Sequence, residues 1–172
     1  MDMTKVIPAV DMRGDDDEDT ALLRDMLEGA KRYLTSFKWC GGIEASYFGL
    51  GVGKVIAVFF FRIRPAKQDV DTELWVVVGD VPPAYLVTDQ APNPACALKM
   101  YIDLMGEWVT AVREGRPVDE LIPVNVAPTV EWADKLDSRL VFLEKEILSQ
   151  YPEDLSACGS ESASSGDATP PR

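Results

Sequence analysis

Four strand-like runs joined by short links constrain the fold more than any other feature of the sequence. They lie between residues 43 and 89, and Gly- or Pro-bearing links separate them. Parallel strands need crossover connections of a dozen residues or more, so these links favour an antiparallel meander. The runs are Ile43 to Phe48, Val55 to Arg64, Glu73 to Asp80 and Ala84 to Asp89.

Three segments with helical periodicity flank these runs. Asp19 or Thr20 is the expected cap of the first, and Asn93 followed by Pro94 begins the second. The segments are residues 20–37, 93–115 and about 129–150. The expected inner stripe of the third is Trp132, Leu136, Leu140, Leu143 and Ile147. We therefore predict an α+β fold, a four-stranded antiparallel meander sheet packed with three helices in the order α-β-β-β-β-α-α.

The longest run, VIAVFFFRIR, shows which face of the sheet must be covered. Successive side chains of a strand point to opposite faces. One face carries no charge, and it consists of Val55, Ala57, Phe59, Phe61 and Ile63. We expect the helices to cover this face. Pairing across the next link predicts Arg64 opposite Glu73, Ile63 opposite Leu74, Phe61 opposite Val76 and Phe59 opposite Val78.

The opposite face of the sheet mixes apolar and charged side chains. If all three helices pack on the charge-free face, this second face stays exposed, with an apolar centre and an Arg-bearing rim typical of protein–protein interfaces. We therefore predict partner binding, or self-association as a homodimer, through Phe48, Phe60, Arg62, Arg64 and Trp75, with Phe60 and Trp75 as anchors. Two alternatives stay open. The third helix covers this face and gives a three-layer core, or the arginines make only cross-strand contacts.

The stretch GLGVGK, residues 49–54, resembles a phosphate-binding loop. A P-loop needs a Gly separated by four residues from its Gly-Lys pair and Ser or Thr after the pair, but those positions hold Phe48 and Val55. A dinucleotide loop precedes a helix, whereas a strand-like run follows here. We therefore expect no nucleotide and a hairpin turn with an odd number of loop residues, whose glycines supply positive φ angles. That register sends Tyr47 to the charge-free face and Phe48 to the other.

Charge and composition divide the chain into a domain and two tails. The net charge is −12, and much of the acidity lies at the two ends. We predict an acidic disordered tail over residues 1–18, a single α+β domain over 19–155, and a disordered Ser/Gly/Pro-rich tail over 156–172. Without clustered Lys and Arg, no nucleic acid is expected as a partner. No apolar segment is long enough for a membrane helix, so no membrane is expected either.

The residues available for chemistry are few. Histidine is absent, which excludes His-dependent nucleophile systems and His-ligated zinc. The three cysteines, Cys40, Cys96 and Cys158, are scattered, so we expect no disulfide framework and a reduced, cytoplasmic setting. No catalytic, cofactor-binding or metal-binding residues are predicted. Asp80 and Asp89 end adjoining strand-like runs and could act as acid and base or hold a hard metal, although Asp at such positions more often caps a turn.

Several blocks of the sequence carry a family resemblance. They are RYLTSFKWC, SYFGLGVGKVIAVFFFRI, ELWVVVGDVPPAYLVTDQAPNPACAL and PVNVAPT, within about residues 31–148. They resemble a family of small, stand-alone bacterial proteins of unknown function. The resemblance implies a bacterial, cytoplasmic protein and no particular activity or site.

Two functions follow from these observations. The first is a non-enzymatic protein-binding module, such as an adaptor or an immunity-like protein that masks its partner. The alternative is a small carboxylate-dependent enzyme that uses Asp80 and Asp89. A concave pocket lined by these acids would favour the enzyme, and an exposed apolar patch would favour the binding module.

Overall fold

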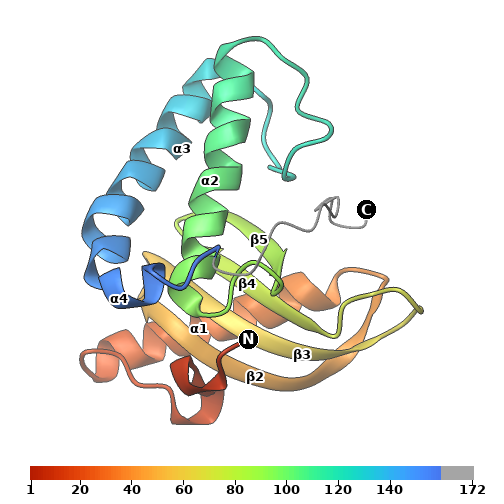
Figure 1. Ribbon diagram of the computed structural model, residues 1–172, viewed down its shortest axis with the longest axis vertical. Coiled ribbons are helices and arrows are strands. Elements are labelled where there is room, and N and C mark those ends of the chain that lie inside the picture. Colours follow the sequence, from red (N-terminus) through yellow and green to blue (C-terminus); the bar gives the residue numbers. More distant parts are fainter. Residues whose placement is uncertain (160–172) are drawn as a thin grey trace.

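An antiparallel sheet with helices on both faces forms the centre of the molecule (Figure 1). The computed structural model describes residues 1–159. The strands, in their spatial order, are β1 (Ile7–Pro8), β2 (Cys40–Val52), β3 (Ile56–Pro65), β4 (Glu73–Gly79) and β5 (Val81–Val87). The α-helices of this part of the chain are α1 (Asp17–Thr35), α2 (Pro94–Arg113), α3 (Val130–Phe142) and α4 (Pro152–Leu155). Short helical turns cover Met3–Lys5, Ala9–Asp11, Leu143–Ile147 and Leu148–Gln150.

The α+β class and the antiparallel sheet are confirmed, but the expected four strands and three helices are wrong in number. The structure adds β1 and α4. Both elements are very short, with two and four residues, so they have too few residues to show a periodic pattern in the sequence.

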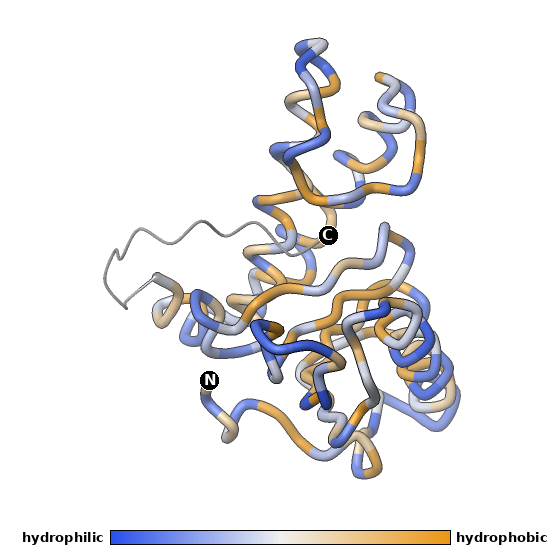
Figure 2. Tube along the Cα trace, turned by 90° about the vertical axis from the view of Figure 1, so that its right-hand side faces the viewer, coloured by the Kyte–Doolittle hydropathy of each residue, from blue (hydrophilic) through white to orange (hydrophobic). Residues whose placement is uncertain are grey.

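The helices form two layers on opposite faces of the sheet. α1 packs on one face, and α2 packs on the other, with α3 beside α2 (Figure 1). Figure 2 shows the pair formed by α2 and α3 extending away from the sheet. Every residue from Ile56 to Phe61 is buried, since β3 separates two cores. Phe59 and Phe61 belong to the core under α1, and Phe60 belongs to the core under α2.

The register between β3 and β4 differs from the prediction by two residues. Phe61 lies opposite Leu74, Phe59 opposite Val76, and Arg62 opposite Glu73. A shift of two residues leaves every side chain on its predicted face. The charge-free face is therefore covered by a helix, α1, as expected. The β4 residues opposite the β3 residues of this face differ from the predicted ones.

The GLGVGK stretch forms the end of the β2–β3 hairpin. Val52 pairs with Ile56, which leaves a loop of three residues and confirms the odd-numbered loop. The expectation that its glycines supply positive φ angles is wrong, because Lys54 takes that conformation, with φ 65°. Gly49 instead allows a close approach, since a Cβ there would lie 2.7 Å from the Pro94 side chain.

Irregular pairing within β2 changes which face its aromatic residues occupy. The register shifts between Ile43 and Ala45 and again between Phe48 and Leu50. As a result Tyr47 lies on the α2 side of the sheet and Phe48 on the α1 side, the reverse of the prediction. A bulge adds one residue to one strand and therefore inverts the side chains beyond it.

Side-chain caps fix the helix starts. The Asn93 side chain accepts a hydrogen bond from the Cys96 N–H at 2.9 Å, and Pro94 takes the first helical position, as predicted. Thr129 caps α3. The predicted cap of α1 is wrong by three residues or more, because Asp16 accepts from the Asp19 N–H at 2.8 Å.

The N-terminal segment packs on the domain, so the expectation of a disordered tail over residues 1–18 is wrong. Met12 is fully buried against the α1 core, and Val6 is buried in the α2 core. β1 pairs with β2, and the Lys5 ammonium lies 2.6 Å from an Asp154 carboxylate oxygen. Of the predicted C-terminal tail, residues 160–172 lie outside the described residues.

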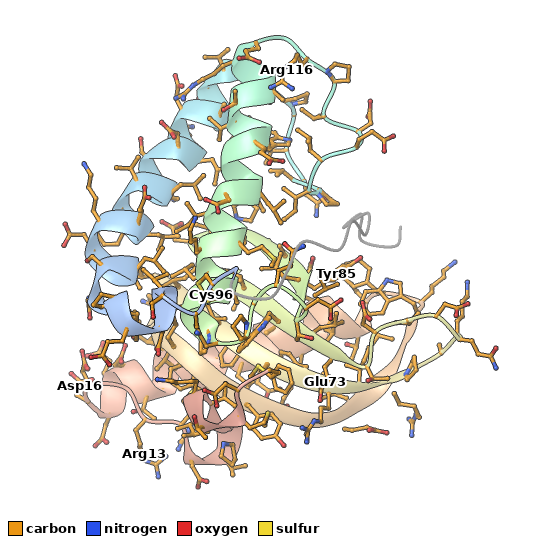
Figure 3. All side chains as sticks on the ribbon, viewed as in Figure 1. Arg13, Asp16, Glu73, Tyr85, Cys96 and Arg116 are labelled. Atoms are coloured by element: carbon orange, nitrogen blue, oxygen red, sulfur yellow. A yellow bond between two sulfur atoms is a disulfide. The ribbon has the colours of Figure 1, made fainter. Side chains whose placement is uncertain are left out.

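The expectation of unpaired cysteines is also wrong. Cys96 at the start of α2 is bonded to Cys158, 62 residues further along the chain (Figure 3). Tyr151 and Leu155, just before Cys158, pack against the α2 core. The bond therefore fastens the segment after α4 to the start of α2. None of the helices within residues 1–159 combines the length and the apolar character needed to cross a membrane.

Candidate functional site

The predicted anchors of a partner interface are core residues. Phe60 and Trp75 have no exposed surface, and their rings are 5.3 Å apart between the sheet and α2. The Trp75 indole N–H donates to the Ala91 carbonyl at 2.9 Å. The expectation of an exposed mixed face is therefore wrong. The three-layer alternative is the observed one, although α2 rather than α3 covers this face.

The other predicted interface residues make contacts within the chain. Phe48 lies on the α1 side, with its ring 6.0 Å from that of Phe59. The Arg62 guanidinium donates to the Glu73 carboxylate at 3.0 Å, and this hydrogen bond raises the pKa of Arg62 above its usual value. Arg64 donates to the Gly41 carbonyl at 3.2 Å. The arginines thus form contacts that hold the sheet together, as the second alternative proposed for them.

Asp80 and Asp89 do not form a common site. β5, a strand of seven residues, runs between them, so they lie at opposite ends of it. At about 3.3 Å per residue, this separates them by roughly 20 Å or more. Asp80 lies 3.0 Å from the Arg139 guanidinium. Within residues 1–159, no group of three or more carboxylate or cysteine side chains could hold a metal ion.

The structure places a groove where α3 passes the turn between β4 and β5. It consists of two adjoining hollows of about 940 and 390 Å³, which share Gly79, Asp80, Val81 and Arg139 in their linings. α1 and the β2–β3 turn border the larger hollow, and α2 and the loop before α3 border the smaller one. We call this feature the α3 groove; its α3 side includes Trp132, Lys135, Arg139 and Phe142.

These α3 residues lie on one side of the helix because they follow helical spacing. Residues three, seven and ten positions after Trp132 lie close to it in angle around the helix. Trp132 at one end is 44% exposed, and Phe142 at the other end is 46% exposed. The prediction that Trp132 points inward is wrong, since the buried stripe is formed by Ala133, Leu136, Leu140 and Leu143.

The middle of the groove is cationic. The Lys135 ammonium lies over the Trp132 ring, 4.6 Å from its centre, and pairs at 3.0 Å with Glu131, which lies outside the lining. Arg139 pairs with Asp80. Lys54 borders the larger hollow and forms no ion pair within residues 1–159. The charged residues of the lining are thus three cations and one acid, in a chain whose net charge is −12.

The lining of the groove has the composition of a binding site. Ser138 borders it, but its hydroxyl donates to the Asp134 carbonyl of its own helix at 3.0 Å. A nucleophile needs a base within hydrogen-bond reach, and the described lining holds no such pair. Apolar side chains beside a few polar groups are the usual lining of a binding site.

Fold and groove together define a three-layer α+β protein with a surface site between a helix and a sheet turn. No family model, curated protein or solved structure matches this chain. The groove therefore has to be interpreted from its own residues.

Proposed function

We propose that this protein is a non-enzymatic protein-binding module and that the α3 groove is its docking surface. The observation that carries the proposal is the half-exposed state of Trp132 and Phe142 at the two ends of the groove. Within residues 1–159, four of the eight exposed large apolar residues lie on α3, namely Val130, Trp132, Val141 and Phe142. Two of these four, Trp132 and Phe142, border the groove, and exposed apolar surface rimmed by polar residues is typical of an interaction site.

The composition of the groove supports a protein partner. Trp and Arg are enriched among the residues that dominate binding energy at protein interfaces, and aromatic residues are enriched in interface centres. α3 is a regular helix, so the backbone that carries its groove residues is ordered before a partner binds. An ordered backbone reduces the entropy lost on binding.

The carboxylate enzyme has less support. Asp80 is bound to Arg139, and Asp89 lies at the other end of β5. A binding module that acts as an adaptor or masks its partner remains the better proposal. The disulfide between Cys96 and Cys158 favours an oxidising compartment, so the cytoplasmic prediction loses the support it took from unpaired cysteines.

A comparison of two surfaces of the same helix tests the proposal. Wild type, a Trp132→Ala/Phe142→Ala variant and a Val130→Ala/Val141→Ala control are immobilised and exposed to a lysate of the native host. Val130 and Val141 are also exposed, but neither borders the groove. The captured protein is identified by mass spectrometry, purified and titrated by calorimetry.

We expect wild type and the control to bind with equal affinity, and the groove variant to bind at least tenfold more weakly. Truncation of an interface anchor typically weakens binding by 1 kcal/mol or more, and two anchors are removed here. Equal affinity of all three proteins, or the absence of any captured protein, would contradict the proposal. Circular dichroism melting curves of the three proteins show whether each is folded.

A further inference from the structure

Resting on the proposed function, we infer that the α3 groove recognises a partner segment with two apolar side chains about 15 Å apart and a single carboxylate between them. The spacing comes from α3 itself. Trp132 and Phe142 are ten residues apart, and an α-helix rises 1.5 Å per residue, which gives about 15 Å. An extended segment covers this length in about five residues.

Apolar contacts are available at each end of the groove. At one end, Trp132 borders the smaller hollow together with Pro123 and Val126. At the other, Phe142 borders the larger hollow together with Met26 and Leu143. Each end can therefore remove one apolar side chain of the partner from water. Burial of such a side chain is the main favourable contribution to association.

The middle of the groove favours a carboxylate. Arg139 donates from Nε to Asp80 at 3.0 Å and from Nη1 to the Lys135 carbonyl at 3.5 Å. Its Nη2 has no hydrogen-bond partner within the described chain. A guanidinium carries five N–H donors arranged to hold a carboxylate, so Arg139 can donate to a second carboxylate as well as to Asp80. Lys54, which has no ion-pair partner in residues 1–159, adds positive potential to the larger hollow that Arg139 also lines.

The Asp80–Arg139 pair does not block this interaction. The Asp80 side chain is 70% exposed, and exposed ion pairs are weak because water and salt screen them. The Asp80–Arg139 pair therefore opposes the binding of a partner carboxylate only weakly, because two apolar contacts already hold that carboxylate in place.

The net charge of the protein limits how acidic the partner can be. At −12, the molecule as a whole repels acidic chains, and only groups within roughly a Debye length, about 8 Å, respond to the local cations. A run of acids would extend beyond the groove and meet the surrounding negative charge. One carboxylate at the centre gains the local attraction without that repulsion.

Selection from random peptides tests the inference. A displayed library of 16-residue peptides is selected on wild type and counter-selected on the Trp132→Ala/Phe142→Ala variant. We expect the peptides that depend on the groove to share two apolar residues with one Asp or Glu between them. Groove-dependent peptides with a neutral or basic centre would overturn the inference and leave the proposed function standing. Failure to recover any groove-dependent peptide would overturn both and would leave a small molecule as the occupant to examine.

A charge exchange provides the second measurement. The Asp80→Lys/Arg139→Glu variant keeps an ion pair across the groove and the net charge, but it puts an acid in place of the α3 guanidinium that would bind the partner carboxylate. We expect the exchange variant to bind the best selected peptide at least tenfold more weakly than wild type does. We expect it to bind the same peptide with Lys in place of its acid at least tenfold more tightly than wild type does. The control exchange, Glu114→Lys/Arg116→Glu, lies just after α2 (Figure 3), and neither residue borders the groove, so it should change neither affinity. Unchanged preference in the groove exchange would overturn the inference.

A second copy of this chain is the other possible occupant. Sedimentation of wild type beside the Trp132→Ala/Phe142→Ala variant detects it. We expect both to be monomers. A dimer that dissociates in the variant would overturn the inference of a different partner.

Discussion

Gly53 and Gly106 look alike in the sequence, but the space around them differs. A Cβ on Gly53 would lie 2.7 Å from both the Leu22 Cβ and an Asp19 carboxylate oxygen, while a Cβ on Gly106 would meet nothing within 4 Å. The Gly53 N–H also donates to Asp19 at 2.7 Å. The glycine at 53 thus brings the β2–β3 turn against α1, and the glycine at 106 only weakens a helix.

Alanine at these two positions should change stability in opposite directions. We expect Gly53→Ala to lower the free energy of unfolding by about 1–3 kcal/mol, because the turn must move away from α1. Gly106→Ala should raise it by about 1 kcal/mol, since alanine favours the interior of a helix such as α2. Urea unfolding of both variants measures the two values. A neutral Gly53→Ala would show that the turn relaxes without loss of contacts.

At the scale of elements, two nearby residues of the N-terminal segment differ strongly in burial. Met12 is fully buried, whereas Val10 is 82% exposed. We expect Met12→Ala to lower the free energy of unfolding by about 2–5 kcal/mol, and Val10→Ala to leave it nearly unchanged. Thermal or urea unfolding of the two variants is the measurement. A small effect at Met12 would mean that residues 1–12 leave the domain in solution.

Helix starts could be predicted from the sequence, and strand partners could not. Asn93 and Thr129 carry capping oxygens, and their effect is local, so two of the three long helices begin where the pattern places them. Cross-strand pairing depends on bulges and on the length of a link. A single extra residue in a strand, as near Gly49, moves the side chains beyond it to the opposite face of the sheet, and the alternation of apolar and polar residues in the sequence does not reveal it.

The α3 groove was missed for a related reason. Trp132 is apolar and lies at the edge of the buried stripe that contains Leu136, so periodicity alone assigns it to the core. The sequence did contain a signal. Lys135 and Arg139 lie on the same side of the helix as Trp132, and burying two charged side chains without partners would cost too much for that side to face the core. The approach of the β4–β5 turn to this side is a tertiary contact that spacing along the chain does not encode.

The disulfide joins two elements that are distant in sequence. Closing 62 residues, the Cys96–Cys158 bond should contribute about 4 kcal/mol by restricting the unfolded chain. We expect Cys158→Ser to lower the free energy of unfolding by up to this amount, and Cys40→Ser, which removes the free cysteine, to change it little. Alkylation followed by mass spectrometry gives an independent measurement. One labelled thiol in the denatured, unreduced protein is expected, and three would contradict the bond.

At the scale of the whole molecule, one sheet serves two cores; the α2 core buries Tyr101, and the partly buried Tyr33 packs against the α1 core. On the α1 side, burial raises the pKa of Tyr33 to about 12, and the neighbouring Tyr85 adds to the shift. On the α2 side, burial raises the pKa of Tyr101, whose hydroxyl donates to the Pro82 carbonyl at 2.6 Å. Ionisation would place a charge inside the α2 core at Tyr101 and against the α1 core at Tyr33. High pH should therefore weaken both layers together.

The sign of the effect follows from these raised values. The folded protein holds the tyrosine protons more tightly than the unfolded chain, in which the pKa is about 10. The contribution of these tyrosines to the free energy of unfolding is complete below about pH 10. It is lost as the pH rises from about 10 through the folded pKa, which is about 12 for Tyr33. Urea unfolding should show stability falling across this window, less steeply in Tyr33→Phe. Absorbance at 295 nm should show fewer of the five tyrosines ionised at pH 11 in the folded protein than in urea. Coincident titration curves would show that neither core protects its tyrosine.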